Sequence, residues 1–286
     1  MVRAYLDLVK YKLSFAVVFS AVTGYLIAGV YPDITLFYLI IGIFLLASGS
    51  AAMNQYTERM IDAKMGRTMK RPLPLKIIPA KRALLISLAL FVSGSLILLF
   101  NGILPFILGI LTVILYNILY TRLKRKTPLS IIPGALVGAL PPLIGFFSTG
   151  QLVLTASIIA FAGFMFLWQI PHFWLIIIKY HKEYKSAGFP TISDYFNEKQ
   201  IRNLVFIWVI LSTFLILLFF IFSDPSFKIF LSFVTILNIS FIWLFHRLLF
   251  SDSKTGEIKG AFILINAFSI IVMSMFIIAS FFKVII

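Results

Sequence analysis

Residues 35–56 read TLFYLIIGIFLLASGSAAMNQY, a run of 22 residues without a charged side chain. An α-helix rises about 1.5 Å per residue, so about 20 apolar residues cross the hydrocarbon core of a bilayer. A water-facing helix would instead carry a charged stripe along one side. The stretch therefore predicts a membrane-spanning helix.

Eight further apolar runs are separated by segments that are charged or rich in Gly and Pro. Overall, 61% of the residues are hydrophobic and 12% are charged, and the mean hydropathy is +1.04, which excludes a soluble domain. The absence of cysteine excludes disulfides and thiolate catalysis. We expect an all-α polytopic membrane protein, a single domain over 1–286 with nine transmembrane helices. The predicted spans are 13–31, 35–56, 83–100, 103–120, 131–148, 152–178, 204–222, 229–246 and 261–282.

The basic residues predict an orientation. If the spans alternate, 23 of the 25 Lys and Arg residues share the side of the N-terminus, and the other side keeps Lys228 and Lys283. Lys and Arg accumulate in cytoplasmic loops because positive segments are retained during insertion. We therefore expect a multi-pass protein of the cell membrane with a cytoplasmic N-terminus and an outer C-terminus. The net charge of +15 then needs no nucleic-acid partner, since topology and attraction to anionic lipid account for it.

The first polar cluster begins inside the quoted run. Asn54, Glu58 and Asp62 are spaced i, i+4, i+8, which places them on one helix face at intervals of about 6 Å. Their oxygens suit Mg²⁺, which often shares its ligands with substrate phosphates. Arg67 and Arg71 follow, and guanidinium groups bind phosphate oxygens. The alternative is a solvated helix end with local ion pairs, but Asn54 at the bilayer edge favours a functional cavity.

The second polar cluster ends the sixth predicted span, where residues 166–174 read FLWQIPHFW. Pro171 interrupts the helical hydrogen-bond ladder, and Gln169 and His172 lie about a turn apart beside it. Such a set within a span is costly unless it lines a cavity. Two alternatives stay open: Trp168 is also typical of packing or of an interfacial belt, and His172 is either a hydrogen-bonded helix residue or a metal ligand.

A basic triplet and a small-residue span lie between the two clusters. The triplet 124–126 is mainly a topology signal, although Lys124 would reach a phosphate group nearby. The span after it carries Gly134, Gly138 and Gly145, and small residues predict close helix packing.

Together these stretches resemble the UbiA-type membrane prenyltransferases and, within them, the haem O synthase (protoheme IX farnesyltransferase) family. Residues 54–73, 127–145 and 168–190 carry the resemblance, which covers essentially the whole chain. The first stretch marks the superfamily, whereas W-Q-x-P-H-F-W followed by A-G-x-P is much more specific to the haem-modifying branch. Two departures stand out. The family commonly has Asp where Glu58 stands, and an acidic pair where this chain has Lys182-Glu183, which puts a second metal site in doubt.

The resemblance implies nine helices bundled around a central cavity open to the cytoplasmic side. It implies Mg²⁺, a farnesyl (or longer prenyl) diphosphate donor, haem B as acceptor and the lipid bilayer as surroundings. An association with haem A synthase or a terminal oxidase assembly stays open. The donor would ionise, a haem vinyl group would attack, and water would capture the resulting cation. The implied catalytic residues are Glu58, Asp62, Arg67, His172 and Glu183. The implied substrate contacts are Asn54, Arg71, Lys124, Gln169, Trp168 and Tyr184, and the implied metal ligands are Asn54, Glu58 and Asp62.

Two rival functions remain. Another UbiA-type enzyme that prenylates a quinone precursor or a lipid alcohol would share the first cluster. A transporter would place polar groups at both entrances, whereas here they gather on one side.

Overall fold

The computed structural model describes residues 1–222, 231–251 and 256–285, and within these ranges the chain is helical, with no strand. The all-α prediction is therefore confirmed. The longer helices are α2 (Tyr11–Ile27), α3 (Ile34–Asp62), α4 (Ala80–Leu99), α5 (Ile103–Ile114), α7 (Ile131–Phe147), α8 (Ala156–Ser186), α9 (Glu198–Phe222), α10 (Leu231–Phe250) and α11 (Gly256–Ile285). The short elements are α1 (Val2–Leu8), the π-helix η1 (Leu115–Tyr120), α6 (Thr121–Leu123), and the 3-10 turns η2 (Pro128–Ser130) and η3 (Ile192–Asp194).

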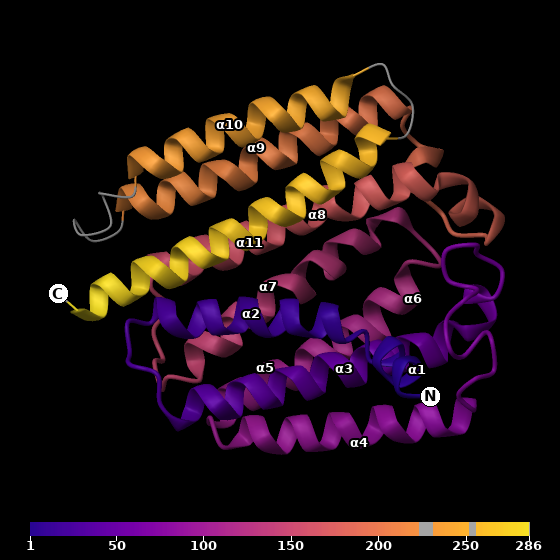
Figure 1. Cartoon of the computed structure of the whole chain (residues 1–286), viewed down its shortest axis with the longest axis horizontal. Coiled ribbons are helices and arrows are strands. Elements are labelled where there is room, and N and C mark those ends of the chain that lie inside the picture. Colours follow the sequence, from indigo (N-terminus) through magenta and orange to yellow (C-terminus); the bar gives the residue numbers. More distant parts are fainter. Residues whose placement is uncertain (223–230, 252–255, 286) are drawn as a thin grey trace.

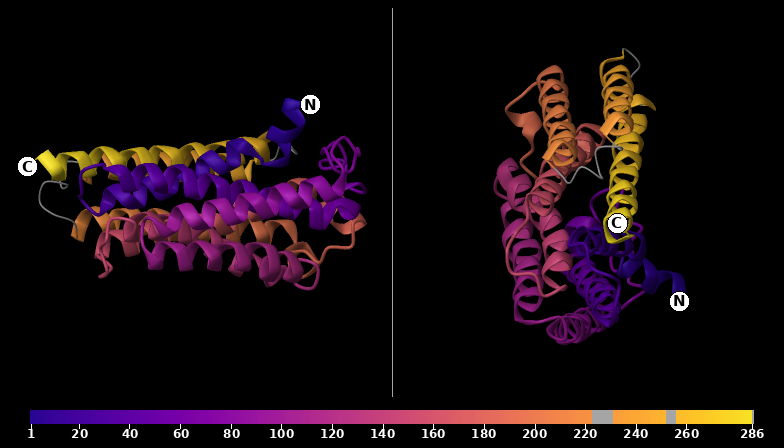
Figure 2. Two further views of the ribbon diagram at one scale, coloured as in Figure 1. Left: turned by 90° about the horizontal axis from the view of Figure 1, so that it is seen from below. Right: turned by 90° about the vertical axis from the view of Figure 1, so that its left-hand side faces the viewer.

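The long helices form one bundle that closes on itself (Figures 1 and 2). Neighbours in sequence are neighbours in space, and α11 returns to contact both α2 and α8. In Figure 1, α1, α6 and the segments 63–79, 124–130 and 187–197 gather at the right-hand end of the bundle. We call the segments 63–79, 124–130 and 187–197 together the polar end.

Membrane crossing follows from helix length and composition. Eight of the described helical segments are long and apolar enough to span a bilayer, which makes the protein a polytopic membrane protein. α2 has only 17 residues, or about 26 Å, because the chain turns at Gly29 (φ +73°) instead of continuing to residue 31. The count of nine spans therefore stays a prediction. Lys228 and the expected start of a span at 229 lie outside the described residues, as does the side chain of Lys283.

Close packing of α2 on α7 brings the two polar clusters to a common space. A Cβ atom on Gly145 would lie 1.9 Å from the carbonyl oxygen of Ala21, and one on Gly24 would lie 2.0 Å from that of Pro142. Only glycine allows the two backbones to approach this closely, as the small-residue pattern predicted for Gly145.

The two helices that carry the clusters extend beyond the bilayer region. α3 is continuous as far as Asp62, so Asn54, Glu58 and Asp62 share one face. α8 continues through Pro171, as the predicted span 152–178 does, and the non-helical dihedral angles lie at Tyr180 (φ −113°, ψ 22°). A proline removes one hydrogen bond, which a packed helix tolerates, whereas the bend at Tyr180 directs the end of α8 over the polar end.

Candidate active site

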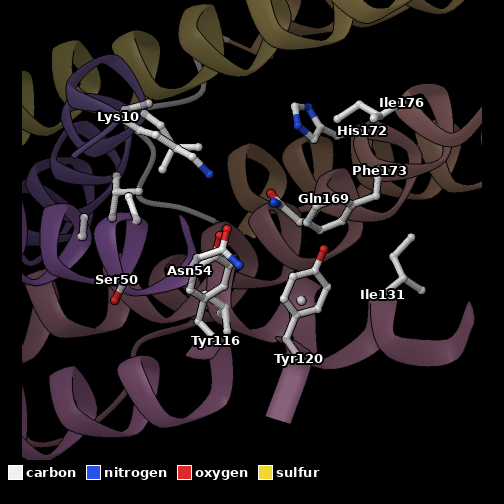
Figure 3. A pocket seen from close by; sticks show the side chains of 18 of the residues that line it. Lys10, Ser50, Asn54, Tyr116, Tyr120, Ile131, Gln169, His172, Phe173 and Ile176 are labelled. Carbon is white, nitrogen blue, oxygen red and sulfur yellow. The ribbon is translucent and has the colours of Figure 1, made fainter. Parts of the chain in front are cut away.

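A cavity of about 620 Å³ lies between α2, α3, α5 with η1, α7, α8 and α11 (Figure 3). Its volume is within the range of ligand-binding pockets, about 300–1,000 Å³. One part is formed by residues of the polar end and the adjoining helix ends. The rest continues among apolar side chains of the membrane-spanning segments. Of the residues expected to be catalytic, substrate-binding or metal-ligating, all but Glu183 line this cavity.

The carboxylates of α3 are buried and charge-compensated. Glu58 and Asp62 are 5% and 4% exposed. Lys124 Nζ lies 2.5 Å from Glu58 Oε1, and Arg71 Nη1 lies 2.9 and 2.7 Å from the two carboxylate oxygens of Asp62. Asn54 Nδ2 donates to Glu58 Oε2 at 3.0 Å. Each carboxylate thus has a cationic partner from a different segment, which a solvated helix end would not require.

Lys10 is a cavity residue that the sequence analysis assigned only to topology. It precedes α2 in a left-handed conformation (φ 46°), and its ammonium group points into the cavity (Figure 3). Burial lowers the pKa of Lys10 to about 7, and the positive charges of Arg71 and Lys124 act in the same direction. Glu58 and Asp62 oppose this shift without cancelling it. A partly buried lysine with such a pKa gains its full charge most readily when an anion binds beside it.

Glu183 lies outside the cavity lining and contacts the chain after α3. Its Oε2 accepts a hydrogen bond of 2.9 Å from the backbone N–H of Arg67. The Arg67 guanidinium donates to the Tyr184 hydroxyl at 3.3 Å and lies over the ring of Tyr180. These contacts hold the segment 63–79 against the end of α8, so Glu183 supports the position of Arg67. A catalytic role for Glu183 stays a prediction.

The π-helix η1 brings two tyrosines into the site. Tyr116 and Tyr120 line the cavity with their rings stacked, 5.6 Å apart and inclined by 13°. Tyr120 also stacks on Phe173 of α8 at 5.9 Å, and Lys124 Nζ lies 5.3 Å from the Tyr120 ring centre. Figure 3 shows the hydroxyl group of Tyr120 directed toward Gln169. π-Helical turns inside α-helices are often found at functional sites.

The second polar cluster lines the α8 side of the cavity. Trp168 is anchored there, because its Nε1 donates to the carbonyl oxygen of Ile265 in α11 at 2.9 Å. His172 Nδ1 is buried without a hydrogen-bond partner, while Asn266 of α11 is the side chain that hydrogen-bonds to the imidazole. Gln169 fits beside Gly138, where a Cβ would lie 3.1 Å from Gln169 Oε1.

The charges suit an anionic ligand with a long apolar part. The cavity lining contains two carboxylates and five cationic side chains: Lys10, Lys12, Arg67, Arg71 and Lys124. Among the described residues, no group of three or more His, Cys, Asp or Glu side chains would hold a metal ion by itself. A metal at Glu58 and Asp62 would therefore need further ligands from a bound substrate.

Several further cavity residues are marked by local sequence patterns. Tyr116 and Tyr120 stand at i, i+4 before Lys124, so all three share a helix face. Asn266 is a polar residue inside the last predicted span, the same signal that singled out Asn54. Lys10 had no such signal, because its entry into the cavity depends on the turn between α1 and α2.

Known proteins share both the sequence and the fold. Residues 17–277 match the model of the UbiA prenyltransferase family. A protoheme IX farnesyltransferase of Listeria monocytogenes is 34% identical over 249 residues, covering 84% of this chain and 81% of that protein. One of Geobacter sulfurreducens is 37% identical over 190 residues, covering 66% and 70%.

Two solved structures have the same fold at low sequence identity. A digeranylgeranylglyceryl phosphate synthase superposes with a TM-score of 0.76 at 19% identity, covering 98% of both chains. A UbiA homologue of Archaeoglobus fulgidus, bound to GPP and Mg²⁺, superposes with a TM-score of 0.75 at 14% identity, covering 99% of this chain and 100% of that one. With a matching family model over most of its length, and with a cavity that joins cationic and apolar parts, this chain belongs to the UbiA prenyltransferase family.

Proposed function

We propose that the protein transfers a farnesyl group from farnesyl diphosphate to a vinyl group of haem B, with addition of water, giving haem O and diphosphate. The observation that carries the proposal is a single cavity with cations and carboxylates at one end and apolar walls beyond them. The names of the relatives, protoheme IX farnesyltransferase, support haem as the acceptor.

The diphosphate would bind at the polar end. Arg71 and Lys124, held by Asp62 and Glu58, flank this space, and Arg67 reaches it from the segment supported by α8. As the bond between farnesyl C1 and oxygen breaks, negative charge grows on the leaving diphosphate. Positioned cations stabilise that charge more strongly here than in water, because the site is largely shielded from solvent.

The residues of α3 fit Mg²⁺. Glu58 and Asp62 present buried oxygens one turn apart on the cavity side, and Mg²⁺ commonly uses one or two carboxylates together with substrate phosphates. Asn54 orients Glu58 now and would offer its own oxygen after rotation of the amide. When bound, Mg²⁺ would neutralise part of the diphosphate charge. The Mg²⁺-bound homologue supports this choice of metal.

The apolar part of the cavity would hold the prenyl chain and keep water from the allylic cation. Its wall includes Val17, Ile43, Leu46, Val113 and Ile144. Water near a carbocation would give farnesol instead of the transfer product, so a dry wall favours attack by the acceptor.

The acceptor would lie along α8. Farnesyl C1 forms a carbon–carbon bond with one vinyl carbon, and the oxygen of a water molecule bonds to the other, releasing a proton. His172 would accept that proton at Nδ1, which has no partner in the protein. Gln169 and Trp168 would contact the porphyrin, and Tyr184 would contact the donor beside Arg67.

The orientation is also part of the proposal. The basic residues that gather at the polar end would place it on the cytoplasmic side of the cell membrane. Donor would then enter from the cytoplasm or the inner leaflet. A complex with haem A synthase or a terminal oxidase assembly would receive an apolar product without its release into water.

Expression in a host that makes only haem B tests the proposal. Extracted haems should include a more apolar species, heavier by one farnesyl group and one hydroxyl, as measured by chromatography and mass spectrometry. Asp62→Asn should abolish it, whereas Glu198→Gln, a change at an exposed carboxylate that pairs with Arg202 and does not line the cavity, should not. If haem B is unchanged while a quinone precursor or lipid alcohol is consumed, haem is not the acceptor. The assignment of a prenyl diphosphate as donor would still hold.

A further inference from the structure

A second cavity, of about 410 Å³, lies between α3, α4 and the run α5–η1–α6. On α3 and η1 it uses other faces than the active-site cavity does. Met53 and Thr57 of α3 line it instead of Asn54 and Glu58, and Asn117 of η1 lines it instead of Tyr116 and Tyr120. The two cavities therefore lie on different sides of α3 and of η1, and they adjoin at Val113 of α5, which lines both.

The wall around this second cavity faces the membrane. Only 11% of the most apolar part of Ile103–Leu123 is buried within the protein, the smallest share among the candidate spans. Ile114 and Ile118, which line the cavity, are 45% and 46% exposed. In the bilayer such side chains contact acyl chains, so the cavity is accessible to lipid.

The mouth of the cavity is basic. Arg122 and Arg125 line it, both are exposed, and no acidic residue is among the lining side chains. Arg125 Nη2 donates to the carbonyl oxygen of Thr57 at 3.4 Å, which places its guanidinium across the gap between α6 and α3. Neither arginine forms an ion pair with an acid among the described residues.

An unsatisfied polar atom lies between the basic mouth and the apolar wall. Asn117 Nδ2 donates to the carbonyl oxygen of Val113 at 3.2 Å, but Asn117 Oδ1 is buried without a partner. A buried acceptor of this kind costs free energy unless a ligand or water supplies a donor. The order along the cavity, from cations to a polar atom to hydrocarbon, is also the order of groups in a phospholipid.

We propose that this cavity binds one anionic phospholipid of the surrounding bilayer. The phosphate contacts Arg122 and Arg125, and one acyl chain covers the apolar wall that includes Phe91 and Ile118. The hydrated ester region supplies the donor that Asn117 Oδ1 lacks. A zwitterionic lipid carries a competing ammonium group, and free phosphate leaves the wall uncovered. The site is independent of the prenyl acceptor.

Native mass spectrometry of the full chain in detergent tests the site. The protein is mixed with phosphatidylglycerol or phosphatidylcholine of the same acyl composition. We expect one retained phosphatidylglycerol in preference to phosphatidylcholine. Arg122→Gln with Arg125→Gln should weaken its retention about 30-fold, which corresponds to about 1 kcal/mol for each arginine near an anionic lipid. Lys81→Gln with Lys199→Gln removes the same charge from two exposed residues outside both cavities, and should change retention less than about twofold.

A second variant tests the acyl-chain part. Ile118→Trp fills the apolar wall from a partly exposed position and should reduce phosphatidylglycerol retention with both arginines present. Equal retention of the two lipids by the unmodified protein would overturn the proposal. So would equal losses in the two double variants, displacement of the lipid by inorganic phosphate, or unchanged retention in Ile118→Trp.

Discussion

Replacing Lys10 should change how donor binding depends on pH. Burial lowers the pKa of this lysine to about 7, and Arg71 and Lys124 add to the shift, so above that pH the free protein holds it largely neutral. A diphosphate in the cavity adds negative charge and favours the ammonium form. Binding at higher pH must therefore include uptake of a proton, and the affinity for donor must fall as the pH rises.

The magnitude follows from the pKa. If a bound diphosphate returns the Lys10 pKa from about 7 to its ordinary range, the apparent dissociation constant should rise about tenfold between about pH 6 and about pH 8. Lys10→Arg should remove this increase, because a guanidinium stays charged throughout. In Lys10→Gln the dissociation constant should also not rise between these pH values. This variant should bind the donor about tenfold more weakly at about pH 6, since a hydrogen bond to a charged group is lost.

Titration calorimetry with a non-reactive farnesyl thiodiphosphate measures both the dissociation constant and the proton uptake on binding. Runs in two buffers with different ionisation enthalpies give the number of protons taken up on binding. The analogue's own ionisation is common to all variants, so the difference between the unmodified protein and Lys10→Arg isolates the lysine. Lys64→Arg, at an exposed position outside the cavity, is the control. An identical pH dependence in the unmodified protein and in Lys10→Arg would refute the reasoning.

Three further results are expected. Glu183→Ala should raise the KM for donor severalfold, because the hydrogen bond to the N–H of Arg67 is lost. Glu183→Gln should retain most activity, because an amide oxygen still accepts that hydrogen bond. Loss of turnover in both variants would instead indicate a chemical role for Glu183. Gly145→Ala should lower the free energy of unfolding by about 3 kcal/mol, since its Cβ would lie 1.9 Å from a carbonyl oxygen of α2. The control Gly260→Ala, whose Cβ would have its nearest contact at 3.4 Å, should change the melting temperature little in the same assay. Trp168→Phe should cost about 1 kcal/mol by removing its hydrogen bond to α11, and an unchanged melting temperature would argue against that anchor.

Much of the fold was predictable from local patterns. The apolar runs led to the membrane-spanning helices, and the i, i+4, i+8 spacing of Asn54, Glu58 and Asp62 led to a shared helix face, because the bilayer length and the helical repeat act on neighbouring residues. Prediction was weaker where a residue has two local explanations. Lys10 was assigned to topology, although its side chain lines the cavity.

Contacts between distant segments could not be read from the sequence. Glu183 and Arg67 are 116 residues apart, and only the folding of 63–79 against α8 brings the Glu183 carboxylate to the backbone N–H of Arg67. Likewise, Lys10 lines the same cavity as Asp62 because of the turn between α1 and α2. Hydrophobicity and helical periodicity are properties of short stretches, and they predicted where the helices run. Ion pairing and cavity formation depend on which helix faces meet, and that follows from the packing of the whole bundle.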